Sequence, residues 1–353
     1  MRKILFVAGG SGGHVFPAVA VIEDILNRHP EWKTIFGTDE RCKQMVRQAL
    51  SADTEIRLAP YTRIDGRHRS FWTPFKFVHS VYAAAVILKK INPDLVMGFG
   101  GYVCIPSIVA ARFLGIPCIT HEQNVRPGKA NLLLKKLGIP IAYTFKPDCA
   151  SEFWSGYPIR KHMVRIPAGE AKIKLGLNPD QPVLLITGGS QGAQAVNSLI
   201  SGILGCLKGW QILHLTGSNA SGLPPESAAY KKMEFCADMT AAYSAADMVI
   251  SRAGAGALHE IAAFRKKAVI IPYPHAGSHQ KANAEACAGS EFGTIMSVID
   301  EAHLSDTEIL RLIQQLQEKP SIIEDNFLNN SGHCMRFDGT GRLADKIEAL
   351  IEG

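Results

Sequence analysis

The sequence predicts an α/β protein made of two doubly wound domains. An apolar run, a glycine loop and an amphipathic stretch follow one another at residues 3–28, and the same order returns at residues 182–207. A strand, a glycine loop and a helix open a nucleotide-binding α/β domain. The chain has 353 residues, 46% of them hydrophobic, which is enough apolar material for two cores.

The first half of the chain alternates strand and helix patterns. It opens with an apolar strand at residues 3–8, the loop GGSGGH and an amphipathic helix at residues 15–28. The pattern then predicts strands at residues 34–36, 94–98, 117–121 and 141–145, and helices at residues 75–90 and 106–114. Strands that alternate with helices indicate a parallel sheet.

The second half repeats this organisation. An apolar, β-branched run at residues 182–187 ends in the loop GGSQG, and we expect a helix over residues 193–207. Strands are predicted at residues 211–215, 248–251 and 268–272, and helices at residues 241–246, 255–264 and 280–288.

Turn-forming residues mark the boundary between the halves. Gly156, Tyr157 and Pro158 form such a cluster, so we expect an N-terminal domain over residues 1–160 and a C-terminal domain over residues 161–353. A last helix, at about residues 340–353, could pack back on the N-terminal domain. If the two sheets face each other, their carboxyl ends should line a cleft between the domains.

Positive charge is concentrated in the first half. Residues 1–160 contain 21 Lys and Arg against 12 Asp and Glu, whereas residues 161–353 contain 17 against 20. A basic half favours an anionic partner, such as a phosphorylated substrate, a membrane surface or a nucleic acid. A solvated face without any partner would give the same charge balance.

Hydrophobic runs and cysteines indicate the compartment. The longest apolar runs, near residues 81–88 and 183–186, are far shorter than the ~20 residues of a membrane-spanning helix. The N-terminal apolar run breaks into glycines too early for a signal peptide. The eight cysteines are scattered without a Cys-x-x-Cys motif, which favours free and mostly buried thiols. We therefore expect a cytoplasmic protein.

Both glycine loops are suited to binding phosphate. A glycine-rich turn before a helix presents backbone N–H groups and the positive end of the helix dipole to an anion, although a turn without a ligand can have the same sequence. The P-loop motif of ATPases is missing. Asp39 follows the second strand, where an NAD enzyme carries its ribose-binding acid, so that alternative stays open. With no Asp-x-Asp motif and no close cluster of metal ligands in the sequence, we expect neither a metal site nor a cofactor.

A series of short motifs resembles the MurG family of bacterial glycosyltransferases. The motifs are GGSGGHVFPA from residue 9, GFGGYV from residue 98, HEQN from residue 121, PIR from residue 158, GGSQG from residue 188, SRAGA from residue 251 and EIAA from residue 260. Their order and spacing over residues 5–290 make the resemblance specific. The loops at residues 125–128 and 272–279 depart from the family pattern.

The resemblance implies both a fold and a reaction. Members of this family are GT-B enzymes of glycosyltransferase family 28, which have two facing Rossmann-like domains. They transfer GlcNAc from UDP-GlcNAc to the MurNAc C4 hydroxyl of lipid I, an undecaprenyl diphosphate-linked acceptor, and so form lipid II for peptidoglycan. The transfer inverts the anomeric centre, so a single displacement suffices, through a transition state like that of glycoside hydrolysis. The C-terminal domain then binds UDP-GlcNAc and the N-terminal domain binds the acceptor.

His14 is the expected catalytic base. A histidine with a pKa near ~6.5 can take a proton from the acceptor hydroxyl at neutral pH, although a histidine at a helix start can also have a purely structural role. Glu122, in the HEQN motif, is the second candidate for the base and could instead orient His14.

The resemblance also implies substrate contacts. Without a metal ion, the diphosphate has to be met by an arginine, backbone N–H groups and a helix dipole, and Arg160 matches the arginine. Glu260 matches the acid that accepts ribose hydroxyls, Gln280 matches a sugar contact, and Cys236 matches a residue whose backbone meets uracil. The other expected substrate-binding residues are Ser11, Gly12, Gly13, Asn124, Ser190, Gln191, Ala255, Gly256, Ala257, Leu258 and His259.

Residues 61–90 combine basic residues with aromatic ones. Such a surface is typical of proteins that dock on an anionic leaflet, and we expect a peripheral protein on the cytoplasmic face of the cell membrane. The same residues could stack on nucleic acid, but no RNA-binding motif accompanies them, so no nucleic-acid partner is expected. The aromatic residues could also belong to the core side of an amphipathic helix. The residues are Tyr61, Arg63, Arg67, Arg69, Phe71, Trp72, Phe75, Lys76, Phe77, Lys89 and Lys90.

Two other functions stay open. A related GT-B enzyme, such as a UDP-GlcNAc 2-epimerase or a transferase with another acceptor, would share the fold, but those families lack the motifs at residues 98–103 and 121–124 together. A non-catalytic subunit that binds sugar nucleotides is the other alternative. The presence of both half-domains and His14 in one chain argues against it.

Overall fold

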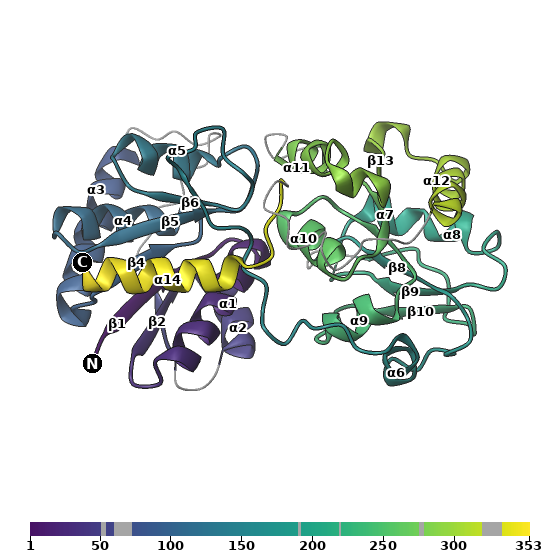
Figure 1. The fold of residues 1–353 in the computed structure, drawn as a ribbon, viewed down its shortest axis with the longest axis horizontal. Helices are drawn as coiled ribbons and strands as arrows, with labels where there is room; N and C mark the ends of the chain where they lie inside the picture. The colour runs from purple at the N-terminus through teal and green to yellow at the C-terminus, as the bar shows by residue number, and fades with distance from the viewer. Residues whose placement is uncertain (51–53, 60–72, 190–191, 219, 275–278, 320–333) are drawn as a thin grey trace. The chain divides into compact units, whose positions relative to one another are not determined.

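The computed structural model describes residues 1–50, 54–59, 73–189, 192–218, 220–274, 279–319 and 334–353. The chain forms two compact units (Figure 1). Unit 1 contains Met1–Lys161 and Met335–Gly353, and unit 2 contains His162–Cys334. Each unit has one parallel sheet with helices, so the predicted α/β class is confirmed.

Unit 1 contains a seven-stranded parallel sheet in the order β3-β2-β1-β4-β5-β6-β7. The sequence pattern does not predict β3 and β7, because β3 is a short edge strand with exposed charges and β7 has only two residues. The strands are β1 (Lys3–Val7), β2 (Lys33–Thr38), β3 (Glu55–Leu58), β4 (Leu95–Gly98), β5 (Cys118–Glu122), β6 (Ile141–Tyr143) and β7 (Phe153–Trp154).

Helices bury both faces of this sheet, which explains its continuous apolar strands. Ile4 and Phe6 of β1 pack in one core with α1 and α14, whereas Leu5 and Val7 pack in another core with α3 and α4. The helices are α1 (Gly12–Arg28), α2 (Glu40–Ala49), α3 (Thr73–Ile91), α4 (Cys104–Phe113), α5 (Lys129–Lys136) and α14 (Gly339–Glu352).

The C-terminal helix α14 packs on unit 1. Figure 1 shows it, in yellow, alongside α1, and its Leu343 and Ile347 are fully buried there. The hydroxyl of Thr340, in its first turn, donates a hydrogen bond to the carbonyl oxygen of Ile159 at 2.7 Å. The apolar face of this amphipathic helix therefore completes the core of unit 1.

Unit 2 repeats the topology of unit 1 with a six-stranded parallel sheet in the order β10-β9-β8-β11-β12-β13. Its strands are β8 (Val183–Thr187), β9 (Gln211–Leu215), β10 (Tyr230–Met233), β11 (Met248–Ser251), β12 (Lys267–Ile270) and β13 (Met296–Val298). Its helices are α6 (Ala168–Lys174), α7 (Gln194–Ser198), α8 (Ile200–Ile203), α9 (Met239–Ala245), α10 (Ala255–Ala263), α11 (His279–Ala288) and α12 (Asp306–Glu318), with 3-10 turns η1 (Glu291–Thr294) and η2 (Glu301–His303).

The single helix predicted over residues 193–207 is wrong. The structure divides it into two short helices, α7 and α8, and ends the second at Ile203. The hydroxyl of Ser198 bonds back to the carbonyl oxygen of Gln194 at 2.8 Å, a contact that weakens a helix. Gly202 and Gly205 follow, and glycine costs about 1 kcal/mol relative to alanine inside a helix.

Candidate functional site

Each sheet has one point at which the strand order reverses. β1 lies between β2 and β4, and β8 lies between β9 and β11. In open α/β sheets, ligands bind at the carboxyl edge beside such a point. The segments that leave this edge are residues 8–11 and 99–103 in unit 1, and residues 188–189 and 252–254 in unit 2. Both glycine loops therefore begin at the carboxyl edge beside a reversal point, which is where open α/β sheets bind ligands.

His14 lies in the first turn of α1, at the reversal point of unit 1. Its Nδ1 is 2.9 Å from the carbonyl oxygen of Gly9. Because a carbonyl only accepts hydrogen bonds, Nδ1 carries the proton, and Nε2 of the neutral ring keeps its lone pair. Burial lowers the pKa of His14 below its usual value, and the Gly9 carbonyl and the Glu122 charge offset only part of this shift. The ring is therefore neutral at pH 7, with one nitrogen able to accept a proton.

Two glycines after β4 leave the space that the imidazole ring of His14 occupies. Gly100 and Gly101 have φ angles of +88° and +76°, which favour glycine. A Cβ atom on Gly100 would lie only 3.1 Å from Cδ2 and 3.2 Å from Nε2 of His14. A Cβ atom on Gly101 would lie 3.0 Å from the Gly9 carbonyl oxygen that His14 uses. The GFGGYV motif thus leaves room for the imidazole, a role that the glycine cluster alone does not reveal.

Glu122, at the end of β5, is 2% exposed and accepts four hydrogen bonds from described residues. Its Oε1 accepts from the backbone N–H and the side-chain amide of the half-buried Asn124, at 2.8 and 3.1 Å. Its Oε2 accepts from the backbone N–H of Gly128 and from Nδ2 of Asn131, both at 2.8 Å. The carboxylate therefore shapes the loop after β5 and acts on His14 only through its charge. This geometry favours His14 over Glu122 as the base.

A buried chain of polar groups, which the sequence does not reveal, supports the same edge. Nε2 of Gln123 donates to the carbonyl oxygen of Phe99 at 2.7 Å and lies 3.2 Å from Nδ1 of His121. Since an amide N–H only donates, His121 accepts at Nδ1 and donates from Nε2 to the carbonyl oxygen of Gly156 at 3.2 Å. Burial lowers the pKa of His121 to about 4, so this ring stays neutral and links the loops after β4 and β5 to the turn at Gly156.

The other expected site residues of unit 1 lie around α1. Ser11 is the N-cap residue of α1 and makes no side-chain capping bond. Gly12 is buried and Gly13 is exposed in the first turn. The guanidinium of Arg160 lies 4.9 Å from the centre of the Phe16 ring, so this arginine is stacked on α1. All of these residues border the turn that carries His14.

In unit 2, α10 begins at the reversal point. Its N-cap residue, Gly254, provides no side-chain bond to the N–H groups of the first turn, which contains Ala255, Gly256 and Ala257. An uncapped helix start of this kind is suited to an anion such as a diphosphate. Glu260, half-buried, lies one turn further along the helix.

Three other expected donor contacts point inward. Leu258 and His259 are fully buried, and Nδ1 of His259 donates to the carbonyl oxygen of Ala255 at 2.8 Å. Cys236 is 3% exposed, and its thiol donates to the carbonyl oxygen of Asp238 at 3.3 Å. Any ligand would therefore meet these residues through their backbone.

Gln280 joins two loops at the carboxyl edge of unit 2. Its Oε1 accepts from the backbone N–H groups of Ala253 and Tyr273, at 3.1 and 3.0 Å. The loops after β11 and β12 are thus held together by one side-chain oxygen, and the amide nitrogen is the group left for donation to a ligand. Ser190 and Gln191 lie outside the described residues.

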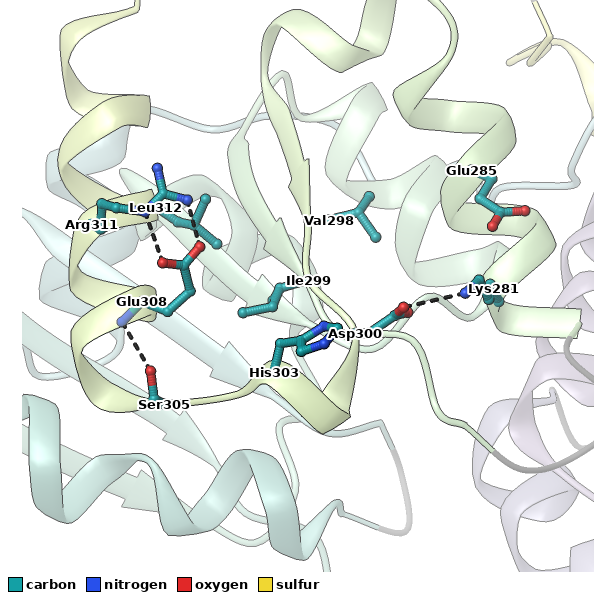
Figure 2. Close-up of a pocket in the computed structure, with 10 residues that line it drawn as sticks. All are labelled: Lys281, Glu285, Val298, Ile299, Asp300, His303, Ser305, Glu308, Arg311 and Leu312. Carbon is teal, nitrogen blue, oxygen red and sulfur yellow. Dashed lines mark hydrogen bonds and ion pairs between the residues drawn. The ribbon is translucent and has the colours of Figure 1, made fainter.

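A cavity of about 660 Å³ lies between α11 and α12, beyond the end of β13. Figure 2 shows two ion pairs among the residues that line it, one between Lys281 and Asp300 and one between Arg311 and Glu308 on α12. None of the expected site residues lines this cavity. Its mutually paired charges do not favour a ligand of either sign.

Asp39, the residue that kept an NAD enzyme open, has another role. Its carboxylate is 2% exposed and caps α2 by accepting from the backbone N–H of Cys42 at 3.1 Å. A second bond, from Arg41, reaches it at 2.7 Å. A carboxylate engaged in this way does not favour a ribose contact.

The described ranges contain neither a cluster of metal ligands nor a helix that could span a membrane. Within them, no three His, Cys, Asp or Glu side chains are grouped so that they could hold a metal ion. The helices built from these residues are all too short or too polar to span a bilayer.

Known proteins resemble the chain along almost all of its length. Residues 4–138 match the N-terminal domain of glycosyltransferase family 28, and residues 183–331 match its C-terminal domain. The UDP-N-acetylglucosamine–N-acetylmuramyl-(pentapeptide) pyrophosphoryl-undecaprenol N-acetylglucosamine transferase of Shewanella halifaxensis is 34% identical, over 99% of this chain and 98% of that protein. The enzyme of the same name from Halothermothrix orenii is 34% identical, over 89% of this chain and 90% of that protein.

A solved structure agrees with these relatives. The crystal structure of Acinetobacter baumannii MurG superposes with a TM-score of 0.73 at 26% identity, covering 99% of this chain and 100% of that one. Its two-domain GT-B fold accounts for the two parallel sheets described above. The chain therefore belongs to glycosyltransferase family 28, among the MurG enzymes.

Proposed function

We propose that this chain transfers GlcNAc from UDP-GlcNAc to the MurNAc C4 hydroxyl of lipid I, with inversion, and so forms lipid II for peptidoglycan. The names of its relatives support the donor and the acceptor. The observation that carries the chemistry is the neutral His14, whose Nδ1 is held by Gly9 and whose Nε2 keeps a lone pair.

In the proposed reaction, the C4 oxygen attacks the anomeric carbon of GlcNAc as the bond from that carbon to the diphosphate breaks. His14 takes the hydroxyl proton at Nε2, and UDP leaves with the bonding electron pair. A positioned base of this kind typically contributes about 10²- to 10⁴-fold in rate. The base comes from unit 1, whereas the residues proposed to hold the donor come mainly from unit 2.

The first turn of α10 and Arg160 are proposed to meet the charge of the diphosphate. Glu260 would accept hydrogen bonds from the ribose hydroxyls, and Gln280 would donate its amide to the sugar. The uncapped start of α10 and the bonds that fix the oxygen of Gln280 support this assignment.

Replacing Glu260 by alanine should raise the KM for UDP-GlcNAc by about 10- to 100-fold, because a hydrogen bond to a charged group contributes roughly 1.5–3 kcal/mol. The kcat should change little, since ribose is held equally in the ground state and the transition state. Steady-state kinetics measure both parameters. Glu285→Ala, which removes an exposed carboxylate from α11, is the matched control. An unchanged KM in Glu260→Ala would remove the ribose assignment.

We further propose that α3 docks unit 1 on an anionic membrane surface. Phe75, Val78 and Tyr82 follow one another at helical spacing and are 62%, 66% and 68% exposed. Lys89 and Lys90 are exposed in the last turn of the same helix. Apolar side chains next to lysines suit the interface of an anionic leaflet. Such docking would hold the chain at the membrane surface, next to its proposed lipid-linked acceptor.

The structure describes only part of the surface predicted from the sequence, and the residues that it describes do not all lie on the exposed face. Phe75 is exposed as expected, whereas Phe77 packs against the core of unit 1. The remaining aromatic and arginine residues of that prediction, which are Tyr61, Arg63, Arg67, Arg69, Phe71 and Trp72, lie outside the described residues.

The triple variant Phe75→Ser, Val78→Ser and Tyr82→Ser should bind vesicles containing phosphatidylglycerol at least about tenfold more weakly than the wild type, because it removes apolar area from the interface. Binding of the wild type should also fall in high salt and on neutral vesicles. Co-sedimentation measures both effects. Ile173→Ser, at a 66% exposed position of unit 2, is the control. Equal sedimentation of the wild type and the triple variant would contradict the docking surface.

A transfer assay tests the proposed function as a whole. With radiolabelled UDP-GlcNAc and a short-chain lipid I analogue, label should move to the acceptor, and UDP release should require the acceptor. Conversion of UDP-GlcNAc to an epimer without acceptor would favour a 2-epimerase. Binding of UDP-GlcNAc with no turnover would favour a non-catalytic subunit.

A further inference from the structure

Asp24, in the C-terminal half of α1, carries a buried carboxylate and is only 1% exposed. Acidic side chains are almost never buried to this degree unless they are paired, so the partners of Asp24 indicate its role. Its Oδ2 pairs with Nε of Arg28, one turn further along the same helix, at 3.0 Å. Its Oδ1 pairs with Nζ of Lys161, the last residue of the first segment of unit 1. One carboxylate thus joins α1 to a segment that is distant in sequence.

The backbone is anchored on both sides of Arg160. This segment belongs to no helix or strand, so side-chain contacts have to fix its conformation. On one side, the carbonyl oxygen of Ile159 accepts a hydrogen bond from the hydroxyl of Thr340 at 2.7 Å. On the other side, Lys161 forms its ion pair with the buried Asp24. Arg160 is therefore held between two neighbours that are tied to helices of unit 1.

The two helices that hold these neighbours are also tied to each other. Nη1 of Arg28, on α1, pairs with Asp345 at 2.6 Å and with Glu348 at 3.3 Å, both on α14. The same helix α14 carries Thr340 in its first turn. Asp24 is the buried member of this set of charges, and it connects the helix pair to the backbone next to Arg160.

We propose that Asp24 is a positioning residue for Arg160, because through Lys161 it fixes the backbone from which the guanidinium reaches an anionic diphosphate. This inference rests on the function proposed above, in which Arg160 meets the diphosphate of the sugar nucleotide. A long side chain loses conformational freedom when it binds an anion, which weakens binding. An arginine on a fixed backbone, stacked 4.9 Å from the centre of the Phe16 ring, has lost part of this freedom before the ligand arrives.

The substitution Asp24→Asn gives opposite signs for positioning and for simple electrostatics. It removes a negative charge beside Lys161, so charge alone would tighten the binding of UDP. Loss of positioning should instead weaken UDP binding by about two- to tenfold, the size of the effect of ordering one long side chain. Binding of uridine, which lacks the diphosphate, should stay unchanged. NMR titration of the full-length protein measures both affinities. Unchanged or tighter UDP binding, or an equal weakening for uridine, would overturn the proposal.

A second variant breaks the same ion pair without touching the buried carboxylate. The side chain of Lys161 is 56% exposed, so Lys161→Gln leaves the core intact and should weaken UDP binding by about two- to tenfold. Lys161→Arg keeps the charge and can form the pair, so it should restore wild-type affinity. Asp94→Asn is the matched control, since it breaks an ion pair of 2.9 Å with Arg2 at the other end of the strands of unit 1. A loss of affinity in Lys161→Gln but not in folded Asp24→Asn would show that the lysine acts by its own charge and would overturn the proposal.

Arg160→Ala separates a failure of this inference from a failure of the proposed function. It should weaken UDP binding by about 10- to 100-fold, the range for a hydrogen bond to a charged group. Adding Asp24→Asn to it should cause no further loss, because the arginine that Asp24 positions is gone. An unchanged affinity in Arg160→Ala would contradict the diphosphate contact in the proposed function. A full additional loss in the double variant would leave that contact in place and overturn the positioning role of Asp24 alone.

Discussion

Replacing His14 by alanine is expected to lower kcat by about 10²- to 10⁴-fold, the range that a positioned general base contributes. The affinity for UDP should change little, because all the proposed nucleotide contacts except Arg160 lie in unit 2, whereas His14 lies in unit 1. Steady-state kinetics with the lipid I analogue measure the first effect, and calorimetric titration with UDP measures the second.

His303→Ala, which removes an exposed histidine from unit 2, is the matched control and should retain wild-type kcat. If His14→Ala keeps a near-normal kcat and Glu122→Gln shows the large loss, the base is Glu122 and the interpretation of its four hydrogen bonds is wrong. If His14→Ala also loses UDP binding, the division of roles between the two units fails.

Gly100→Ala should lower kcat/KM by about tenfold although the residue carries no reactive group. The new Cβ would lie 3.1 Å from Cδ2 and 3.2 Å from Nε2 of His14, and 3.2 Å from Oε1 of Gln123, so the imidazole and this amide have to give way by a few tenths of an ångström. Since a displacement of about 1 Å can cost roughly 10²-fold in rate, a shift of this smaller size should cost about tenfold. The variant should also lose stability, because alanine is strained at a φ of +88°.

The control for this variant separates strain from displacement of the base. Gly115 has a φ of +72°, and a Cβ there would meet no atom within 4 Å. Gly115→Ala therefore imposes a similar backbone strain far from His14 and should lose stability while keeping kcat/KM. Urea unfolding and kinetics of both variants make the comparison. An equal loss of activity in the two variants would show that the effect of Gly100→Ala is not transmitted through His14.

The sequence predicts those parts of the fold that depend on local patterns. The apolar runs of β1 and β8, each followed by glycines and a helix, predict the repeated parallel sheets, since a strand buried on both faces reads as continuous apolar sequence. Strands such as β7 and β13 escape prediction, because they have two and three residues and form only by pairing with a neighbouring strand. The break between α7 and α8 also escapes prediction, because it depends on one side-chain bond of Ser198 and on the glycines that follow.

The candidate site is predicted less completely, because its contacts join distant residues. The motifs locate His14 and Glu122 but not their partners. Glu122 accepts two of its four hydrogen bonds from Gly128 and Asn131, which reach it only after the chain folds back. The space for His14 likewise depends on the close approach of the loop after β4 to Gly9. For Asp39, the sequence suggests a role that the structure does not favour. Its place after β2 is compatible with a ribose contact, but its carboxylate caps α2.

The pH dependence of kcat/KM in the wild type and in His14→Ala tests most directly whether the neutral imidazole is the base. His14 must be unprotonated to accept a proton, and burial lowers its pKa. Activity of the wild type should therefore be full at neutral pH and fall on acidification, along a limb with an apparent pKa below the usual ~6.5 of histidine. In His14→Ala the residual activity should lack this limb. The same acidic limb in both proteins would contradict the account.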